Sequence, residues 1–556
     1  MKKKKIILIV LLVLLVLILP GVVYYKIQLY KMTYIYTYFR QLDEDYISEN
    51  QKKLDIYKYD LAFDLYPEDK MFKAKAVITG TVLDSTIRSI DLNFYDNFHI
   101  NKITLNGKTT EFENEGTRLS IPFFPSSTNA FEIEVDYKGT PKKAGLEGFV
   151  FGNRSGNSLV YNLSEPNYAS TWFPCNDIPF DKTNLDIYIT NDSNMVSVSN
   201  GILVDINTND SRRTYHWRTE YAISTYLIAL YSSNYKSFSD EYISQNKLDT
   251  MKVEYFILPD KFENAKNDFS GHVKMLEIFS KLFGEYPFVK EKYGIAEFLW
   301  YAGAMEHQTI TGVSSNMIGG KKLFEDTFVH ELAHQWWGNA VGPKSWKDIW
   351  LNEGFATYSE ALYYEAVSGK AALQSTMLSN YSSNFSGSLA EPGPFLFTRT
   401  MYDKGAWVLH MLRWEVGDSN FFNILKNYFE TYKYSNASIN DFKSVCEDIS
   451  KQNLDIFFEQ WVYNEGQIDL EYKTEKLAID NNHLTKIFLD QVQDDYEVFH
   501  FPLQIQLKFE DDKEEFLRYN IVSRDTVIEI RTAEEPNSIK LDPDNWLLAQ
   551  ISLNDE

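Results

Sequence analysis

Apolar positions between residues 51 and 238 recur mostly with a period of two. Leu61, Phe63 and Leu65, for example, alternate with polar residues, which is the pattern of a strand with one buried face. Asn106-Gly107 is typical of a tight turn between two antiparallel strands. This zone therefore predicts a large antiparallel β domain.

The period becomes helical from residue 239 to residue 466. Phe269, Val273 and Leu276 lie three and four positions apart, and Gly284 provides a C-terminal stop for this helix. Further helices are predicted over 404–416, 419–433 and 439–450. The zone predicts a mainly helical domain.

Residues 467–556 return to alternation. Leu503, Ile505 and Leu507 are separated by polar residues, and the zone predicts a small β-sandwich. The expected fold class is therefore multidomain α+β. An N-terminal β domain is followed by a helical domain and then by a C-terminal β-sandwich.

An uncharged apolar stretch of twenty residues runs from Ile6 to Tyr25, directly after the lysines at positions 2–5. It is long enough to cross the hydrocarbon core as a helix, and the lysines favour a cytoplasmic N-terminus. A cleaved signal peptide is the alternative, but no A-x-A-like site follows. We expect residues 1–25 to be a transmembrane signal-anchor of a cell-membrane protein. A stalk over 26–50 would then lead to an extracellular catalytic body.

Composition narrows the classes of partner. The chain of 556 residues carries a net charge of −23, which repels nucleic acid phosphates and attracts cationic groups such as a peptide's amino terminus. The favoured alternative to such steering is that the acidity only serves solubility. Its two cysteines, Cys175 and Cys446, form no disulfide framework. We expect free thiols and no nucleic acid partner, and the oligomeric state stays open.

The segment from His330 to His334 has the pattern H-E-x-x-H. Two histidines four positions apart share one helix face, so both imidazoles can bind one metal ion. Glu331 can then face the metal-bound water without being a ligand. Eighteen residues separate His334 from Glu353, the expected third ligand. A chance pattern in a core helix is the alternative, and the third ligand argues against it.

Three further segments carry polar residues that suit catalysis. They are Gly303-Ala304-Met305-Glu306-His307, Tyr402-Asp403-Lys404-Gly405 and Glu165-Pro166, which precedes Phe173-Pro174-Cys175. Together with Asn352-Glu353-Gly354-Phe355-Ala356 and the H-E-x-x-H segment, they closely resemble peptidase family M1, the aminopeptidase N-like gluzincins. The resemblance extends over most of the chain beyond the expected anchor and stalk.

The resemblance implies a fold, an activity and a set of site residues. It implies an N-terminal β-saddle over 51–238, a thermolysin-like catalytic domain over 239–466 and a β-sandwich over 467–556. The implied activity is that of a zinc aminopeptidase, with one Zn²⁺ per chain and peptides with a free N-terminus as substrates. The zinc ligands would be His330, His334 and Glu353, with Glu331 as general base and Tyr402 as oxyanion stabiliser. Glu306 and Glu165 would hold the substrate amine, and Gly303, Ala304 and Met305 would contact the substrate.

The sequence departs from the family pattern at two motif positions: His307 stands where the family usually has asparagine, and Ser170 stands where an arginine often precedes the Phe173-Pro174-Cys175 segment. Thr357 and Glu360 lie on the same helix face as Glu353, where they either support the metal ligands or form an ordinary helix face. His272, His410 and His500 lie outside all motifs and are interpreted as structural.

Three alternatives to an aminopeptidase stay open. A thermolysin-like endopeptidase shares the metal motif but has no need of Glu306 beside Tyr402. Epoxide hydrolysis is known in one branch of the family, but no residue here supports it. An inactive receptor with this fold would be expected to have lost a ligand or the base, and none is lost.

Overall fold

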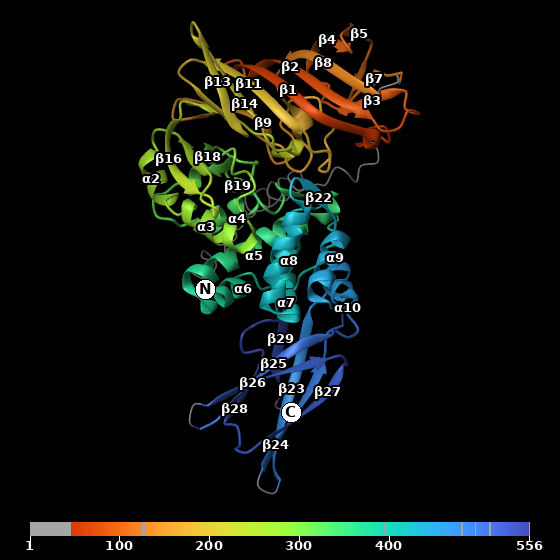
Figure 1. Cartoon of the computed structure of the whole chain (residues 1–556), viewed down its shortest axis with the longest axis vertical. Helices are drawn as coiled ribbons and strands as arrows, with labels where there is room; N and C mark the ends of the chain where they lie inside the picture. Colours follow the sequence, from red (N-terminus) through yellow and green to blue (C-terminus); the bar gives the residue numbers. More distant parts are fainter. Residues whose placement is uncertain are drawn as a thin grey trace, which may run out of the picture.

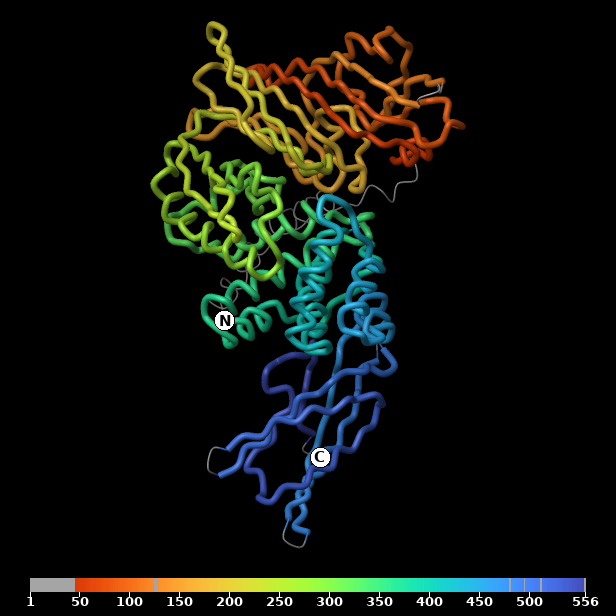
Figure 2. Tube along the Cα trace, viewed as in Figure 1, coloured from red at the N-terminus to blue at the C-terminus, as the bar shows by residue number. Residues whose placement is uncertain are grey.

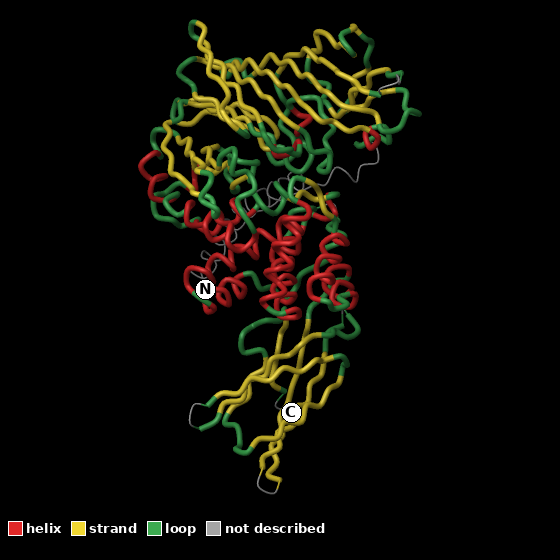
Figure 3. Tube along the Cα trace, in the orientation of Figure 1, coloured by secondary structure: helices red, strands yellow, loops and turns green. Residues whose placement is uncertain are grey.

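The computed structural model describes residues 46–124, 129–393, 395–479, 482–494, 496–510 and 513–554. The molecule is elongated, with a β domain at one end, helices in the middle and a smaller β unit at the other end (Figures 1 and 3). Among the described residues no helix is long and apolar enough to cross a membrane. The predicted anchor over 1–25 and most of the predicted stalk lie outside them.

An eight-stranded sheet forms the larger layer of the N-terminal β domain. Its strand order is β13 (Ile202–Asn209), β14 (Arg212–Arg218), β11 (Asn184–Asp192), β1 (Leu54–Tyr66), β2 (Met71–Val82), β8 (Ala130–Gly139), β4 (His99–Leu105) and β5 (Lys108–Thr109). Neighbouring strands are antiparallel except β1 and β11. The turn between β4 and β5 is confirmed, since Asn106 and Gly107 both have positive φ, as such a two-residue turn requires.

Two smaller sheets complete this domain. One has the order β12 (Val196–Ser199), β15 (Leu230–Ser233), β10 (Asn157–Leu163) and β9 (Gly148–Arg154), and the other has the order β3 (Ser89–Asn93), β7 (Arg118–Pro122) and β6 (Glu113–Glu115). The inward side chains of β1 alternate with half-buried ones and pack into a continuous apolar core. The predicted antiparallel β domain is thus confirmed.

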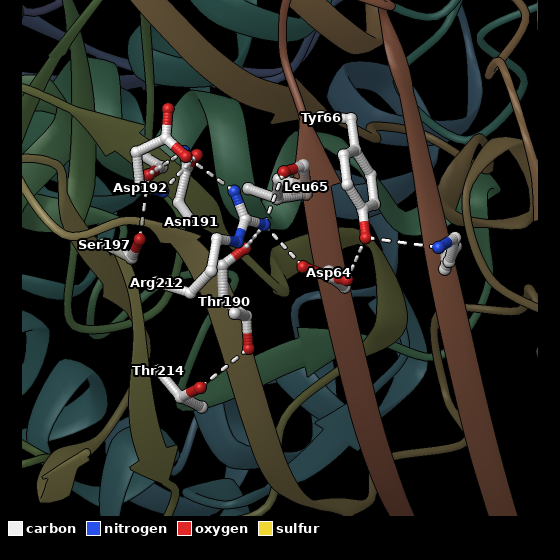
Figure 4. Close-up of polar contacts among 11 residues, drawn as sticks. Asp64, Leu65, Tyr66, Thr190, Asn191, Asp192, Ser197, Arg212 and Thr214 are labelled. Atoms are coloured by element: carbon white, nitrogen blue, oxygen red, sulfur yellow. Dashed lines mark hydrogen bonds and ion pairs between the residues drawn. The ribbon is translucent and has the colours of Figure 1, made fainter. Parts of the chain in front are cut away.

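A group of charged and hydroxyl side chains lies on the opposite face of the large sheet (Figure 4). Arg212 on β14 pairs with Asp192 on β11 at 2.8 Å and also with Asp64 on β1. Beside it, the hydroxyls of Thr190 and Thr214 are 2.8 Å apart. This face is a solvated surface with compensated charges.

The central part of the chain begins with a five-stranded sheet that the helical pattern did not predict. Its order is β16 (Lys236–Ile243), β17 (Thr250–Ile257), β18 (Tyr293–Phe298), β20 (Thr311–Ser314) and β19 (Ala304–Met305). The boundary expected near residue 238 falls inside β16. Helices α2 (Phe262–Asp268), α3 (His272–Phe283), α4 (Glu325–Ala333), α5 (Trp350–Ser368) and α6 (Lys370–Ser379) belong to the same part.

The helices predicted further along the chain are confirmed. They are α7 (Gly405–Val416), α8 (Asp418–Tyr432) and α9 (Ile439–Ser450), followed by the short α10 (Asp455–Phe458). A π-helical turn over Thr400–Lys404 leads into α7, and a short parallel pair of β21 (Val341–Pro343) and β22 (Ser435–Ala437) joins the two helical halves. Helix α3 ends at Gly284, as predicted. Figure 2 shows that α7 to α9 lie beside α4 and α5 and above the C-terminal β unit.

The C-terminal unit contains two small sheets. One has the order β27 (Asp525–Thr532), β24 (Asn482–Gln491), β23 (Ile468–Ile479) and β29 (Ala549–Leu553), and the other has the order β26 (Glu514–Ile521), β25 (Phe501–Lys508) and β28 (Ser538–Leu541). Trp546 stacks on His410 and Trp414 of α7, with ring centroids 4.6 and 5.2 Å away. The unit is therefore packed firmly against the helices.

Candidate metal centre and adjoining cavity

The side chains of the H-E-x-x-H segment converge with Glu353 on one point. His330 lies on α4 and His334 caps its C-terminal end, and their Nε2 atoms are 3.0 Å apart. Oε2 of Glu353, on the first turn of α5, lies 3.4 Å from Nε2 of His330 and 3.3 Å from that of His334. The three predicted ligands are thus brought together, with His334 and Glu353 buried.

This donor set fits a zinc ion. Zn²⁺ bonds to imidazole nitrogen and carboxylate oxygen are about 2.0–2.2 Å long, so tetrahedral ligand atoms stand about 3.3 Å apart. The three distances found here are close to that value. Two imidazoles and one carboxylate leave a fourth position open, as in hydrolytic zinc sites.

Hydrogen bonds behind the two imidazoles orient them toward the metal position. Nδ1 of His330 donates to Oε1 of Glu360 at 2.8 Å, and Nδ1 of His334 donates to the carbonyl of Trp337 at 2.9 Å. Such partners fix the tautomer that leaves Nε2 free to bind the metal. Of the two supporting residues considered, Glu360 makes this contact, whereas the buried hydroxyl of Thr357 has no hydrogen-bond partner among the described residues.

Two glycines bring the metal-ligand helix against the segment that carries Tyr402. A Cβ placed on Gly354 would lie 2.8 Å from Cα of Gly405, and one on Gly405 would lie 2.9 Å from Cα of Gly354. Real Cβ atoms essentially never approach so closely. This contact sets Glu353 and Tyr402 on neighbouring backbones, and the Tyr402 ring stacks on that of His330 with centroids 5.9 Å apart.

A cavity with a volume of about 530 Å³ adjoins the metal position. It is lined by every site residue that the sequence predicted: Glu165, Gly303, Ala304, Met305, Glu306, His330, Glu331, His334, Glu353 and Tyr402. The placement of Glu165 rested only on its offset from Phe173-Pro174, yet its carboxylate lies within 4.8 Å of those of Glu306 and Glu353.

The carboxylates in this cavity lack partners for some of their oxygens. Glu165 and Glu306 are each 4% exposed, and one oxygen of each, like Oε2 of Glu331, has no hydrogen-bond partner among the described residues. Burial, with the charge of Glu306 next, raises the pKa of Glu165 well above its ordinary value. The same two causes raise the pKa of Glu331 to about 8.

The sequence reasoning missed the apolar walls of the cavity. These are formed by Leu146, Trp300, Tyr301, Met317 and Phe397, which lie far apart in the sequence except for the adjacent pair Trp300-Tyr301. No local pattern marks them, since they meet only in the folded chain. Of the histidines interpreted as structural, His272 and His410 are buried in aromatic clusters away from this cavity.

Comparison with known families gives two matches along the chain. Residues 56–227 match the Peptidase M1 N-terminal domain, and residues 268–461 match the Peptidase family M1 domain. The matches together extend over most of the described chain. The first lies in the β domain and the second contains the residues of the metal centre.

Curated relatives are similar over a part of their length. Probable aminopeptidase 2 of Sulfurisphaera tokodaii is 24% identical over 438 residues, which are 74% of this chain and 54% of the relative. Endoplasmic reticulum aminopeptidase 1 of Rattus norvegicus is 30% identical over 329 residues, 54% of this chain and 34% of the relative. The chain thus spans about half the length of the relatives it matches, or less.

Solved structures share the fold. An M1 zinc metallopeptidase from Deinococcus radiodurans superposes with a TM-score of 0.64 at 23% identity, covering 74% of this chain and 94% of that one. Aminopeptidase A of Legionella pneumophila gives a TM-score of 0.76 at 17% identity, covering 92% and 60%. At these identities the likeness concerns the fold.

Proposed function

The chain belongs to peptidase family M1, and we propose that it is a zinc-dependent aminopeptidase that releases the first residue of peptides with a free N-terminus. The observation that carries the proposal is the position of Glu165 and Glu306, whose carboxylates lie within 4.8 Å of that of Glu353. Two buried carboxylates beside a metal centre suit a substrate that brings a positive charge to that point.

The cofactor is Zn²⁺, held by His330, His334 and Glu353. When bound, it supplies Lewis-acid polarisation of water and of the substrate carbonyl. Glu331 takes the proton of the attacking water and passes it to the leaving amine. The hydroxyl of Tyr402 donates to the oxygen that becomes negative in the transition state.

The substrate amine determines which bond is cleaved. Glu306 and Glu165 hold the ammonium group of the first residue, while Gly303, Ala304 and Met305 line the same wall of the cavity. With the ammonium fixed there, only the first peptide bond reaches the metal. Holding the amine in one place in this way orients the peptide bond for reaction, which lowers the barrier.

Membrane attachment is a separate part of the proposal. The apolar stretch from Ile6 to Tyr25 after four lysines supports a single-pass anchor with the catalytic body outside the cell. Carbonate extraction of membranes and protease treatment of intact cells test it. Release by carbonate, or protection of the catalytic body from the protease, would contradict it.

The activity is tested with the purified full-length protein on aminoacyl-anilides, each with a free or an N-acetylated amine. We expect release from the free-amine substrates alone, loss of turnover on chelation and recovery when zinc is added back. Equal cleavage of acetylated substrates would indicate an endopeptidase. Absence of turnover from zinc-loaded protein on all substrates would contradict the proposal.

A further inference from the structure

The four residues from Glu306 to Thr309 form a buried segment at the junction of the β domain and the metal centre. We infer that Gln335 and Asn339 are positioning residues, which hold this segment so that the Glu306 carboxylate stands at a fixed distance from the metal ligands. The inference rests on the proposed function, because it concerns the residue that would bind the substrate amine.

The side-chain amide of Gln335 holds the segment at three main-chain atoms. Its Oε1 accepts from N of Thr309 at 2.9 Å, and its Nε2 donates to the carbonyls of Glu306 and His307 at 3.2 and 3.4 Å. Asn339 donates from Nδ2 to the same carbonyl of Glu306 at 2.7 Å. Both residues are fully buried, so these bonds have no competition from bulk water.

Both amides belong to the turn that directly follows the second metal ligand. Gln335 is next to His334 in the chain, and the main-chain N of Asn339 donates to the carbonyl of His334 at 3.0 Å. Nζ of Lys182, from the β domain, donates to the carbonyl of Asn339 at 2.6 Å. The donors to Glu306 are therefore attached to the backbone that carries His334.

The β domain holds the opposite side of the segment. Tyr231 is hydrogen-bonded to Nδ1 of His307 at 2.6 Å, and Nδ2 of Asn200 donates to the carbonyl of Gln308 at 2.6 Å. N of Gly201 donates to Oγ1 of Thr309 at 2.9 Å. The segment lies between β19 and β20 of the central sheet, and the two amides are what connect it to the turn after His334.

The position of Glu306 would determine which peptide bond of the substrate is presented for cleavage. If Glu306 moves relative to the metal by about 1 Å, an ammonium group held by it no longer presents the first peptide bond correctly, and misplacement of that size costs up to about 100-fold in rate. Loss of Gln335 should thus weaken recognition of the free amine without removing any group that touches the substrate or the metal.

The experiment measures binding rather than turnover. The full-length zinc-loaded protein with Glu331→Gln is titrated with one tripeptide, free or N-acetylated. The discrimination ratio is the Kd of the acetylated peptide divided by the Kd of the free peptide. We expect Gln335→Met to lower this ratio by about 10-fold or more. The effect should be smaller than that of removing one partner of a buried charge pair. Zinc stoichiometry should stay at one, and Kd of the acetylated peptide should stay the same.

Gln460 offers a matched control. It is equally buried, and its amide also holds a main chain at two atoms, donating to the carbonyl of His500 at 2.6 Å and accepting from its N at 2.9 Å. Gln460→Met should lower thermal stability and leave the discrimination ratio unchanged. If Gln335→Met does not fold, Asn339→Ala removes one of the two donors to Glu306 and should lower the ratio by a smaller factor.

The outcomes separate the inference from the proposed function. If the protein with Glu331→Gln as its only change does not prefer the free amine, the proposed function fails and the inference with it. If it prefers the free amine and neither Gln335→Met nor Asn339→Ala changes the ratio, the inference alone is overturned. A lower ratio in Gln460→Met of the same size would also overturn it, since any lost buried amide would then have this effect.

Discussion

Two clusters of carboxylates in this molecule are built in opposite ways. On the outer face of the β domain, Asp64 and Asp192 flank Arg212 (Figure 4), and their side chains are 37% and 59% exposed. In the cavity beside the metal centre, Glu165 and Glu306 are 4% exposed and have oxygens without partners among the described residues. The acids of the first cluster are paired with a cation of the chain itself, whereas those of the second keep oxygens without a partner among the described residues.

The comparison also shows that size does not identify a site. A hollow of about 770 Å³ lies beside Arg212 on the outer face and is larger than the cavity of about 530 Å³ at the metal centre. Most of its wall is formed by polar side chains, among them the hydrogen-bonded pair Thr190 and Thr214. Buried carboxyl groups with unpartnered oxygens, which folding alone does not favour, distinguish the smaller cavity from the larger hollow.

The largest expected effect comes from Glu331. Replacing it by glutamine should lower kcat by about 10²–10⁴-fold, the usual contribution of a general base, because an amide cannot accept the proton of water. Zinc content, measured by atomic absorption, should be unchanged, since Glu331 is not among the three ligand atoms. Asp64→Asn in the outer cluster is the control and should keep full turnover; equal loss in both variants would break the comparison.

The next largest effect is expected at His272, a buried side chain outside both clusters, and it concerns the pH dependence of stability. Burial lowers the pKa of His272 to about 4, although the hydrogen bond to the carbonyl of Phe269 acts in the opposite direction. The unfolded chain takes up this proton near pH 6.5 and the folded chain does not, so stability falls as the pH drops from 6.5 toward 4. The loss should be about 2 kcal/mol at pH 5. His272→Phe should remove that part of the pH dependence of thermal unfolding; an unchanged dependence would contradict this prediction.

A stabilising change is expected inside the cavity. Glu165→Gln replaces a buried carboxyl group beside Glu306 and Glu353 by an amide that cannot ionise, and it should stabilise the substrate-free protein by about 1–2 kcal/mol, as removal of functional strain commonly does. KM for free-amine substrates should rise in the same variant. Calorimetry of the zinc-loaded protein checks the first result, and a lower melting temperature would show that the cluster is not under strain.

The smallest effect belongs to the outer cluster. Arg212→Ala should cost less than about 1 kcal/mol, the usual size for exposed ion pairs, and the difference should shrink further in high salt. Chemical denaturation at low and high ionic strength measures it. A loss of several kcal/mol would mean that this face is more than a solvated surface.

The metal ligands could be predicted from the sequence because local geometry determines them. The spacing of His330 and His334 places both on one face of a helix, and Glu353 falls on the first turn of the next long helix. Glu306 and Tyr402 were predicted from motifs of the family, and both line the cavity.

Other features left no local signal. Strand β18 (Tyr293–Phe298) is buried along its whole length, so it shows none of the alternation that reveals a half-buried strand. This strand was therefore missed. Gln335 and Asn339 were missed for a different reason: an amide in a turn becomes informative only when its partner, here the carbonyl of Glu306, is known.

The contact between Gly354 and Gly405 rules out a common kind of compensating substitution. A larger residue on one side of a packed interface is often accommodated by a smaller one on the other side, but no residue is smaller than glycine. Neither position can compensate for a change at the other, since each Cβ would meet the opposite Cα at less than 3.0 Å. A library randomised at both positions and selected for activity should return glycine at each.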